Sequence, residues 1–284
     1  MNNVIAERLK SMHLSGIAKS CDMRIEQAIR DKLSYQEFLD LLLADEVSNR
    51  ATNGNNKRMQ KAHFPAQKSI EEFDFNAQPS INRQHIYQMG TCEFIRKKEN
   101  ITFIGKPGTG KTHLSIAIGV KAVLQGYTVL FTTLSDMLDD LFMSRADNSY
   151  HRRLQNYILP DLLIIDELGL RKLNQTSVDD FYEVIAKRYE KKSTIITSNK
   201  EFNEWGRVLY DPVLATAILD RLVHHCNFVN IKGPSFRMRE REGLEIIPPK
   251  RRGRPPTKAT VAVDLDEDDF SDEGEEFEDE EACV

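Results

Sequence analysis

One segment of the sequence has the residue types and the spacing that phosphate binding needs. Gly105-Lys-Pro-Gly-Thr-Gly-Lys-Thr112 matches the phosphate-loop pattern GxxxxGK[ST]. Glycines let the backbone curl so that its N–H groups face the phosphates, and the helix that follows adds a favourable dipole. We expect Lys111 to reach the β- and γ-phosphates of ATP, and Thr112 to coordinate Mg²⁺ through its hydroxyl. The residues assigned to the nucleotide are Gly105, Lys106, Pro107, Gly108, Thr109, Gly110, Lys111 and Thr112.

A pair of carboxylates, Asp166 and Glu167, follows the apolar segment Leu162–Ile165. A purely apolar strand is typical of a parallel sheet that is covered on both faces. Its carboxyl end then opens beside the phosphate loop. We expect Asp166 to complete the nucleotide site and to hold the magnesium through water, and Glu167 to polarise the attacking water. The alternatives are a chance glycine turn and a carboxylate pair that only caps a strand; the order of the motifs favours an ATPase.

Two further residues are candidates for the catalytic site. Asn199 ends the segment Thr194-Ile-Ile-Thr-Ser-Asn199, where its amide could orient water against the γ-phosphate. An Asn at a strand end is otherwise a turn residue. Arg221 follows an apolar helical stretch and could reach the ATP of a neighbouring subunit as an arginine finger, or form a surface salt bridge instead.

A basic segment near the C-terminus has a different chemistry. In Pro249-Lys-Arg-Arg-Gly-Arg-Pro-Pro256, Gly253 has no side chain to clash and Pro255 keeps the backbone extended. Arg252 and Arg254 could then lie along the narrow minor groove of A·T-rich double-stranded DNA. A nonspecific basic linker and a localisation signal are the alternatives.

The distribution of charge also favours a polyanionic partner. The formal net charge is −5, but residues 264–281 hold thirteen acidic residues and no basic one, so the remainder carries +8. The acidic run is typical of a disordered, solvated end, although it could also fold back on the basic segment as a DNA mimic.

The order of the predicted elements indicates an α/β fold. Residues 1–62 have helical spacing, with a capping box at Ser34 and Glu37 and a turn at Asn53-Gly54, and residues 63–99 are interpreted as a connector. Residues 100–247 alternate strands with helices, which implies a doubly wound parallel sheet of five strands. The chain then continues through a basic segment, 248–263, into a disordered tail, 264–284. The predicted strands are Ile101–Ile104, Tyr127–Phe131, Leu162–Ile165, Thr194–Thr197 and Phe228–Ile231.

Composition excludes several classes of protein. No run of about 18 apolar residues is present, so we expect no membrane partner. The first ten residues mix charged with apolar side chains, unlike a secretory signal. The four cysteines (Cys21, Cys92, Cys226 and Cys283) lack metal-ligand or redox spacing, so we expect reduced thiols in the cytoplasm.

These motifs together resemble the IstB proteins, helper ATPases of bacterial insertion sequences in the AAA+ superfamily, near the DnaC helicase loaders. The resemblance covers about residues 4–240. Besides the phosphate loop and Leu163–Glu167, its motifs are Arg8-Leu9-Lys10, Tyr35-x-x-Phe38-Leu39-x-x-Leu42-Leu43, Phe73-Asp74-Phe75, Ile195–Asn199 with Trp205, Leu219-Asp-Arg-Leu222 with His224-His225, and Gly233-Pro-Ser-Phe-Arg237.

The resemblance implies more than the residues alone do. Asn199 matches a nucleotide-sensing position, Arg221 matches the arginine before the last strand, and Arg237 would sense nucleotide. The family assembles as an oligomer on DNA in an ATP-dependent manner and recruits or stimulates its partner transposase. A helicase loader, or a nucleotide-binding DNA scaffold with negligible hydrolysis, is the alternative function. The basic segment and the acidic tail lie beyond the matched region.

Overall fold

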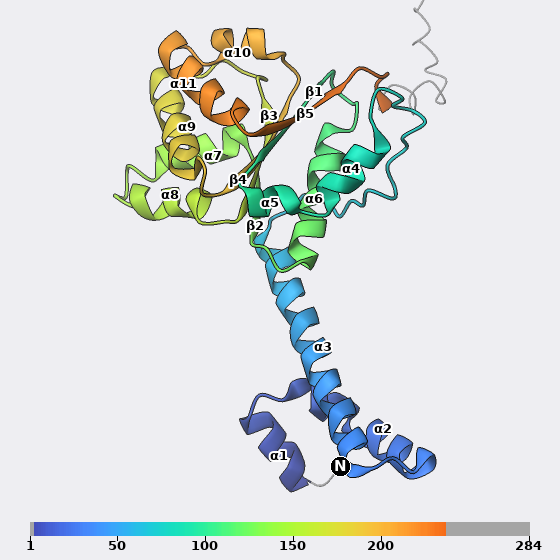
Figure 1. Cartoon of the computed structure of the whole chain (residues 1–284). Helices are drawn as coiled ribbons and strands as arrows, with labels where there is room; N and C mark the ends of the chain where they lie inside the picture. The colour runs from blue at the N-terminus through green and yellow to red at the C-terminus, as the bar shows by residue number, and fades with distance from the viewer. Residues whose placement is uncertain (1–2, 237–284) are drawn as a thin grey trace, which may run out of the picture. The chain divides into compact units, whose positions relative to one another are not determined.

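The computed structural model describes residues 3–236, which form a five-stranded parallel sheet with helices on both faces and a helical N-terminal region (Figure 1). The strands lie in the order β2-β3-β4-β1-β5, so the predicted parallel α/β fold is confirmed. The strands are β1 (Asn100–Gly105), β2 (Val129–Thr133), β3 (Leu162–Leu168), β4 (Ser193–Ser198) and β5 (Cys226–Ile231). The helices are α1 (Asn3–Ser11), α2 (Ser15–Asp31), α3 (Tyr35–Lys61), α4 (Arg83–Gly90), α5 (Glu93–Lys97), α6 (Lys111–Leu124), α7 (Leu134–Met143), α8 (Tyr150–Ile158), α9 (Gln175–Arg188), α10 (Phe202–Val208) and α11 (Pro212–Val223).

The two faces of the sheet carry separate hydrophobic cores. Successive strand residues point to opposite faces, so Leu162 and Ile164 of β3 face one core while Leu163 and Ile165 face the other. Helices α4, α5 and α6 cover the first face, and α7 to α11 cover the second (Figure 1). Burial of β3 on both faces explains why its sequence is continuously apolar.

Helix α6 lies between the sheet and outer segments, and its sequence fits that place. Its apolar residues are buried around most of its circumference. Gly119 permits the close approach, because a Cβ there would lie 2.7 Å from the Ile164 side chain. At the C-terminal end, Gly126 adopts φ 92° and donates to the Val123 carbonyl while Tyr127 donates to Ala122. This is a Schellman motif, and a glycine directly after a helical stretch is its usual sequence signal.

The N-terminal helices pack as a hairpin of α2 against α3. Ser34 and Glu37 form the predicted capping box at the start of α3. The predicted turn at Asn53-Gly54 is wrong: α3 continues through both residues to Lys61, since propagating a helix already formed is favourable even across a glycine. The buried Glu46 carboxylate of α3 accepts hydrogen bonds from the Gly16 and Ile17 amides and so caps α2.

The segment interpreted as a connector contributes to the core. It holds α4 and α5, and it buries apolar side chains from both and from the loop before them. Their helices are too short to show a clear period, which is why the pattern alone did not reveal them.

Arg237, the basic segment with Arg252–Pro255 and the acidic tail lie outside the described residues. Among residues 3–236, no helix combines the length and the apolar character that crossing a bilayer requires.

Candidate nucleotide site

The phosphate loop joins the end of β1 to the start of α6, as the motif requires. Gly108 (φ 79°) and Gly110 (φ 93°) adopt left-handed backbone conformations that other residues rarely accept. The Lys111 ammonium donates to the Gly105 carbonyl at 2.8 Å and to the Lys106 carbonyl at 2.9 Å. Its side chain is therefore folded into the loop, among the backbone groups that would surround a phosphate.

Asp166 lies at the end of β3, opposite the first turn of α6. Its side chain is almost fully buried, and both carboxylate oxygens accept from the Thr112 hydroxyl at 3.0 Å. The Thr197 hydroxyl of β4 also donates to Asp166. Hydroxyl groups from two elements, α6 and β4, therefore hold the Asp166 carboxylate.

Glu167 is presented to solvent by an irregularity in β3. The register between β3 and β4 shifts between Ile165 and Leu168, and Glu167 has φ 65°. A bulge of this kind re-aims a side chain, and a left-handed non-glycine residue is strained. The Glu167 amide donates to the Thr197 hydroxyl at 3.0 Å. One threonine therefore holds both Asp166 and Glu167, and it leaves the Glu167 side chain exposed beside the loop.

Asn199 follows β4 at the same edge of the sheet. Its Oδ1 atom is buried and has no hydrogen-bond partner in the described residues. Gly169, with φ 100°, faces it, and a Cβ at that glycine would lie 3.2 Å from Oδ1. A buried acceptor without a donor is costly, so this atom fits a donor supplied by a ligand or a water.

The residues at this edge fit a magnesium ion. Thr112 and Asp166 offer oxygen ligands, which Mg²⁺ prefers. Burying a carboxylate is costly, and a bound cation would offset that cost. The arrangement of Thr112, Asp166 and Glu167 around the phosphate loop is therefore suited to phosphoryl chemistry.

Arg221 lies elsewhere, on the side of α11 that faces α9. Its guanidinium is 5.2 Å from the centre of the Tyr182 ring and 6.0 Å from that of Tyr189, and it donates to the Ala217 carbonyl. None of these partners belongs to the phosphate loop or the Asp166 cluster. With Val213 and Asp220, Arg221 lines a shallow groove of about 630 Å³. The structure thus brings together every predicted site residue of the described chain except Arg221.

Comparison with known proteins identifies the family of the chain. Residues 7–243 match the family described as IstB-like ATP binding protein. The chain belongs to this family. It is 40% identical over 264 residues to a Pseudomonas aeruginosa protein named as the ATP-binding protein of insertion sequence IS21, covering 93% of this chain and 95% of the relative. It is 41% identical over 241 residues to the corresponding IS5376 protein of Geobacillus stearothermophilus, covering 85% and 96%.

Solved structures show the same fold at lower identity. The IstB-like chain matches the DnaI crystal structure with a TM-score of 0.51 and 21% identity, covering 58% of this chain and 90% of that one. It matches DnaA from Aquifex aeolicus with a TM-score of 0.50 and 20% identity, covering 64% and 55%. These likenesses establish that this IstB-like protein shares the fold of DnaI and DnaA, and no more.

Two segments lie against the phosphate loop of this IstB-like protein in contacts that the sequence analysis did not predict. The ring of Phe73 lies against Gly110, where a Cβ would approach it to 2.4 Å. On the other side, the Phe236 amide donates to the Gly108 carbonyl at 2.8 Å. Gln78 ties the segments together by donating to the Pro234 carbonyl at 2.7 Å. The aromatic pair Phe73 and Phe75 before β1 was the available signal, but spacing alone does not show what an aromatic contacts.

Proposed function

We propose that this IstB-like protein hydrolyses ATP at the site formed by the phosphate loop and the ends of β3 and β4. The observation that carries the proposal is the pairing of a buried Asp166 with a solvent-exposed Glu167, both held by Thr197 beside Thr112. Thr112 and Asp166 would hold Mg²⁺, which neutralises phosphate charge when bound. Lys111 binds the phosphates, Glu167 polarises the attacking water and Asn199 orients it.

Separate measurements of ATP binding and turnover test this assignment. Glu167→Gln should bind ATP normally but hydrolyse it about 10²–10⁴-fold more slowly, because the water loses its polarising carboxylate. Lys111→Ala should weaken ATP binding itself. Glu26→Gln, which changes an exposed glutamate on α2, serves as the matched control and should hydrolyse ATP at the wild-type rate. Wild-type turnover by Glu167→Gln would remove the proposal.

The function extends to an ATP-dependent oligomer on double-stranded DNA in which Arg221 of one subunit completes the site of its neighbour. The separation of Arg221 from the residues of the phosphate loop supports this arrangement. Arg221→Ala alone should be inactive, but mixing it with Lys111→Ala should restore some hydrolysis, because some interfaces then pair an intact loop with an intact arginine. If no mixing ratio restores activity, Arg221 acts within one subunit.

The partner is a transposase, since relatives in the family are named for insertion sequences. In this proposal the ATP-bound oligomer on DNA recruits or stimulates that enzyme. Strand transfer by the cognate transposase should rise with wild-type protein and ATP, and should not rise with Lys111→Ala. A replicative helicase bound in place of the transposase would favour the helicase-loader alternative.

The basic segment adds affinity for A·T-rich duplex, and the acidic run opposes it. Each neutralised phosphate steepens the salt dependence of binding by roughly 0.9 in log units. Alanines at Arg252 and Arg254 should weaken binding to A·T-rich duplex more than to G·C-rich duplex. Deleting residues 264–284 should tighten binding, more at low salt than at high salt. If the arginine variant loses affinity equally for both duplexes, the segment is only a nonspecific basic linker. If the deletion leaves DNA affinity unchanged, the acidic run does not oppose binding.

A further inference from the structure

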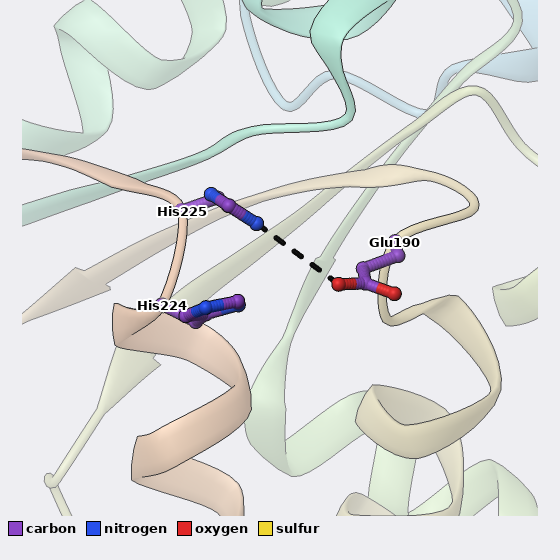
Figure 2. A group of neighbouring side chains, drawn as sticks. All are labelled: Glu190, His224 and His225. Carbon is purple, nitrogen blue, oxygen red and sulfur yellow. Dashed lines mark ion pairs between the residues drawn. The ribbon is translucent and has the colours of Figure 1, made fainter.

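A cluster of possible metal ligands lies outside the nucleotide site, where α9 and α11 end. Glu190 follows α9, His224 is the C-cap of α11, and His225 precedes β5. Each side chain offers one ligand atom, and these atoms lie within 4.8 Å of one another (Figure 2). His225 Nε2 is 4.0 Å from Glu190 Oε1, and the two imidazole ring centres are 4.0 Å apart. All three side chains are exposed, so a dissolved ion can reach them.

We propose that Glu190, His224 and His225 form a surface site for a divalent cation of the zinc class. Two imidazole nitrogens and one carboxylate oxygen are a ligand set that suits Zn²⁺, whereas Mg²⁺ prefers oxygen alone. Zinc–ligand distances of about 2.0–2.2 Å place tetrahedral ligands about 3.4 Å apart. The three side chains are exposed, so small rotations can bring their ligand atoms from the present separations of up to 4.8 Å to that distance. Water completes the coordination.

The backbone that carries the three ligands is already fixed. The His225 carbonyl accepts from Asn100 at the start of β1 at 2.7 Å, and the His224 amide donates to Asp220 within α11. Glu190 sits in a tight turn with φ 58°, and the next residue, Lys191, donates to the Arg188 carbonyl. Binding would therefore order side chains only, without rebuilding the loops, which reduces its entropic cost.

A second interaction orients one of the ligands. The Tyr189 hydroxyl lies 2.8 Å from His224 Nδ1, which assigns Nε2 of the same ring to the metal. Metal-bound histidines usually have such a partner on the other nitrogen. The same Tyr189 ring lies beneath the Arg221 guanidinium. An ion at this site would therefore also restrain the tyrosine that supports Arg221.

Calorimetric titration of nucleotide-free, full-length protein with Zn²⁺ tests the site directly, because no ATP is present to chelate the ion. Wild type should bind one equivalent more than the triple variant Glu190→Gln, His224→Ala, His225→Ala. Cysteine thiols can also bind zinc, but both proteins contain the same cysteines. The difference in Zn²⁺ stoichiometry between the two proteins therefore reports on the proposed site alone. Identical stoichiometry and affinity in the two proteins would overturn the proposal.

Single variants distinguish a built site from scattered surface histidines. The extra Zn²⁺ equivalent is the one that wild type binds and the triple variant does not. His224→Ala and His225→Ala should each weaken its binding at least tenfold, and Tyr189→Phe should weaken it less. His151→Ala, which removes an exposed histidine of α8, is the matched control and should bind like wild type. An equal loss in His151→Ala would overturn the proposal.

Thermal unfolding gives a second readout that does not depend on ATP hydrolysis. Zn²⁺ should raise the Tm of wild type but not that of the triple variant, because only a ligand of the folded state stabilises it. An excess of Mg²⁺ should change the Tm of the two proteins equally, because it does not suit this ligand set. The same Tm shift in the triple variant would overturn the proposal.

Discussion

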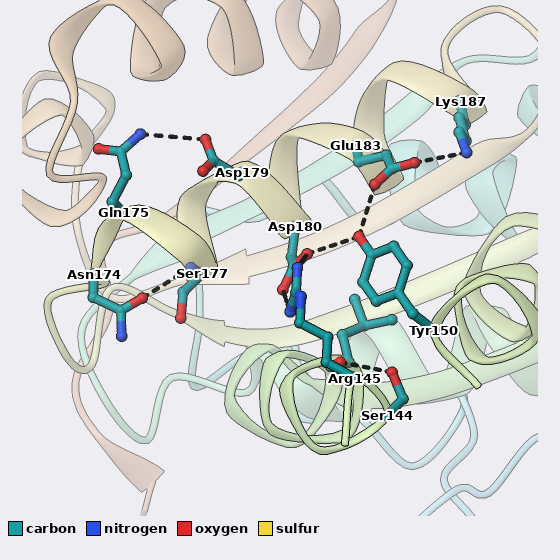
Figure 3. Close-up of polar contacts among 11 residues, drawn as sticks. Ser144, Arg145, Tyr150, Asn174, Gln175, Ser177, Asp179, Asp180, Glu183 and Lys187 are labelled. Carbon is teal, nitrogen blue, oxygen red and sulfur yellow. Dashed lines mark hydrogen bonds and ion pairs between the residues drawn. The ribbon is translucent and has the colours of Figure 1, made fainter. Parts of the chain in front are cut away.

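Two carboxylates, Asp166 and Asp180, are both hidden from solvent but have opposite surroundings. Asp180 of α9 receives a two-pronged ion pair from Arg145 at 2.6 and 2.9 Å, and a hydrogen bond from the Tyr150 hydroxyl at 2.7 Å (Figure 3). Tyr150 also reaches Glu183, which pairs with Lys187. Asp166 instead accepts hydrogen bonds from the hydroxyl groups of Thr112 and Thr197.

The contrast separates a structural cluster from a functional one. The Asp180 cluster balances its charge within the chain and joins α9 to Arg145 and Tyr150, on either side of the loop that precedes α8. The Asp166 carboxylate is held by threonine hydroxyls beside the phosphate loop, and the Asn199 Oδ1 atom at the same edge of the sheet has no donor among the described residues. Burial alone therefore does not mark a site; a buried carboxylate held by hydroxyl groups beside a phosphate loop does.

The largest expected effect comes from neutralising Asp166. Asp166→Asn should lower ATP hydrolysis at least about a hundredfold, because the charge that would hold the magnesium is lost. The free energy of unfolding without nucleotide should stay within about 1 kcal/mol of wild type or rise, since the cost of burying the carboxylate charge disappears. Chemical denaturation and a phosphate-release assay measure the two quantities. A marked loss of stability would show that Asp166 is structural.

The matched change at Asp180 should have the reverse pattern. Asp180→Asn should lower the free energy of unfolding by about 2–3 kcal/mol, less than for a fully buried pair because Arg145 is partly exposed. Hydrolysis by the folded protein should stay near the wild-type rate. A selective loss of turnover without loss of stability would break the comparison.

A smaller effect is expected at the threonine that joins the two carboxylates of the site. Thr197→Val keeps the shape but removes the hydroxyl that Asp166 and the Glu167 amide share. Hydrolysis should fall about tenfold, and stability should fall by about 1–2 kcal/mol, because a buried amide loses its acceptor. Thr197→Ser should restore turnover. If valine and serine behave alike, Thr197 only fills space.

The smallest effect is expected at Tyr150 and depends on pH. Tyr150→Phe should cost about 1 kcal/mol of stability at pH 7, where the hydroxyl donates to the carboxylates. Burial, followed by hydrogen bonds to Glu183 and Asp180, raises the pKa of Tyr150 well above its usual value of 10. The hydroxyl therefore contributes fully below pH 10, and its contribution declines as the pH rises further. Denaturation at pH 7, 9 and 11 should show the gap between the two proteins closing at the highest pH; a constant gap would contradict this.

The sequence by itself determined the phosphate loop, the buried strand behind Asp166, the capping box of α3 and the end of α6. Each depends on local chemistry: glycine conformations, helix caps and the apolar run of a strand covered on both faces. The parallel sheet followed from the alternation of strands with helices.

Only the tertiary structure decided what the carboxylates contact and where Glu167 points. The bulge at Glu167 arises from the pairing of β3 with β4. Thr197 hydrogen-bonds to Glu167 and Asp166, which lie 30 and 31 positions before it in the chain. The contacts of Arg221 with Tyr182 and Tyr189 depend on the packing of α11 against α9. Such pairings are set by how distant segments pack, and residue types at short spacing carry no information about them.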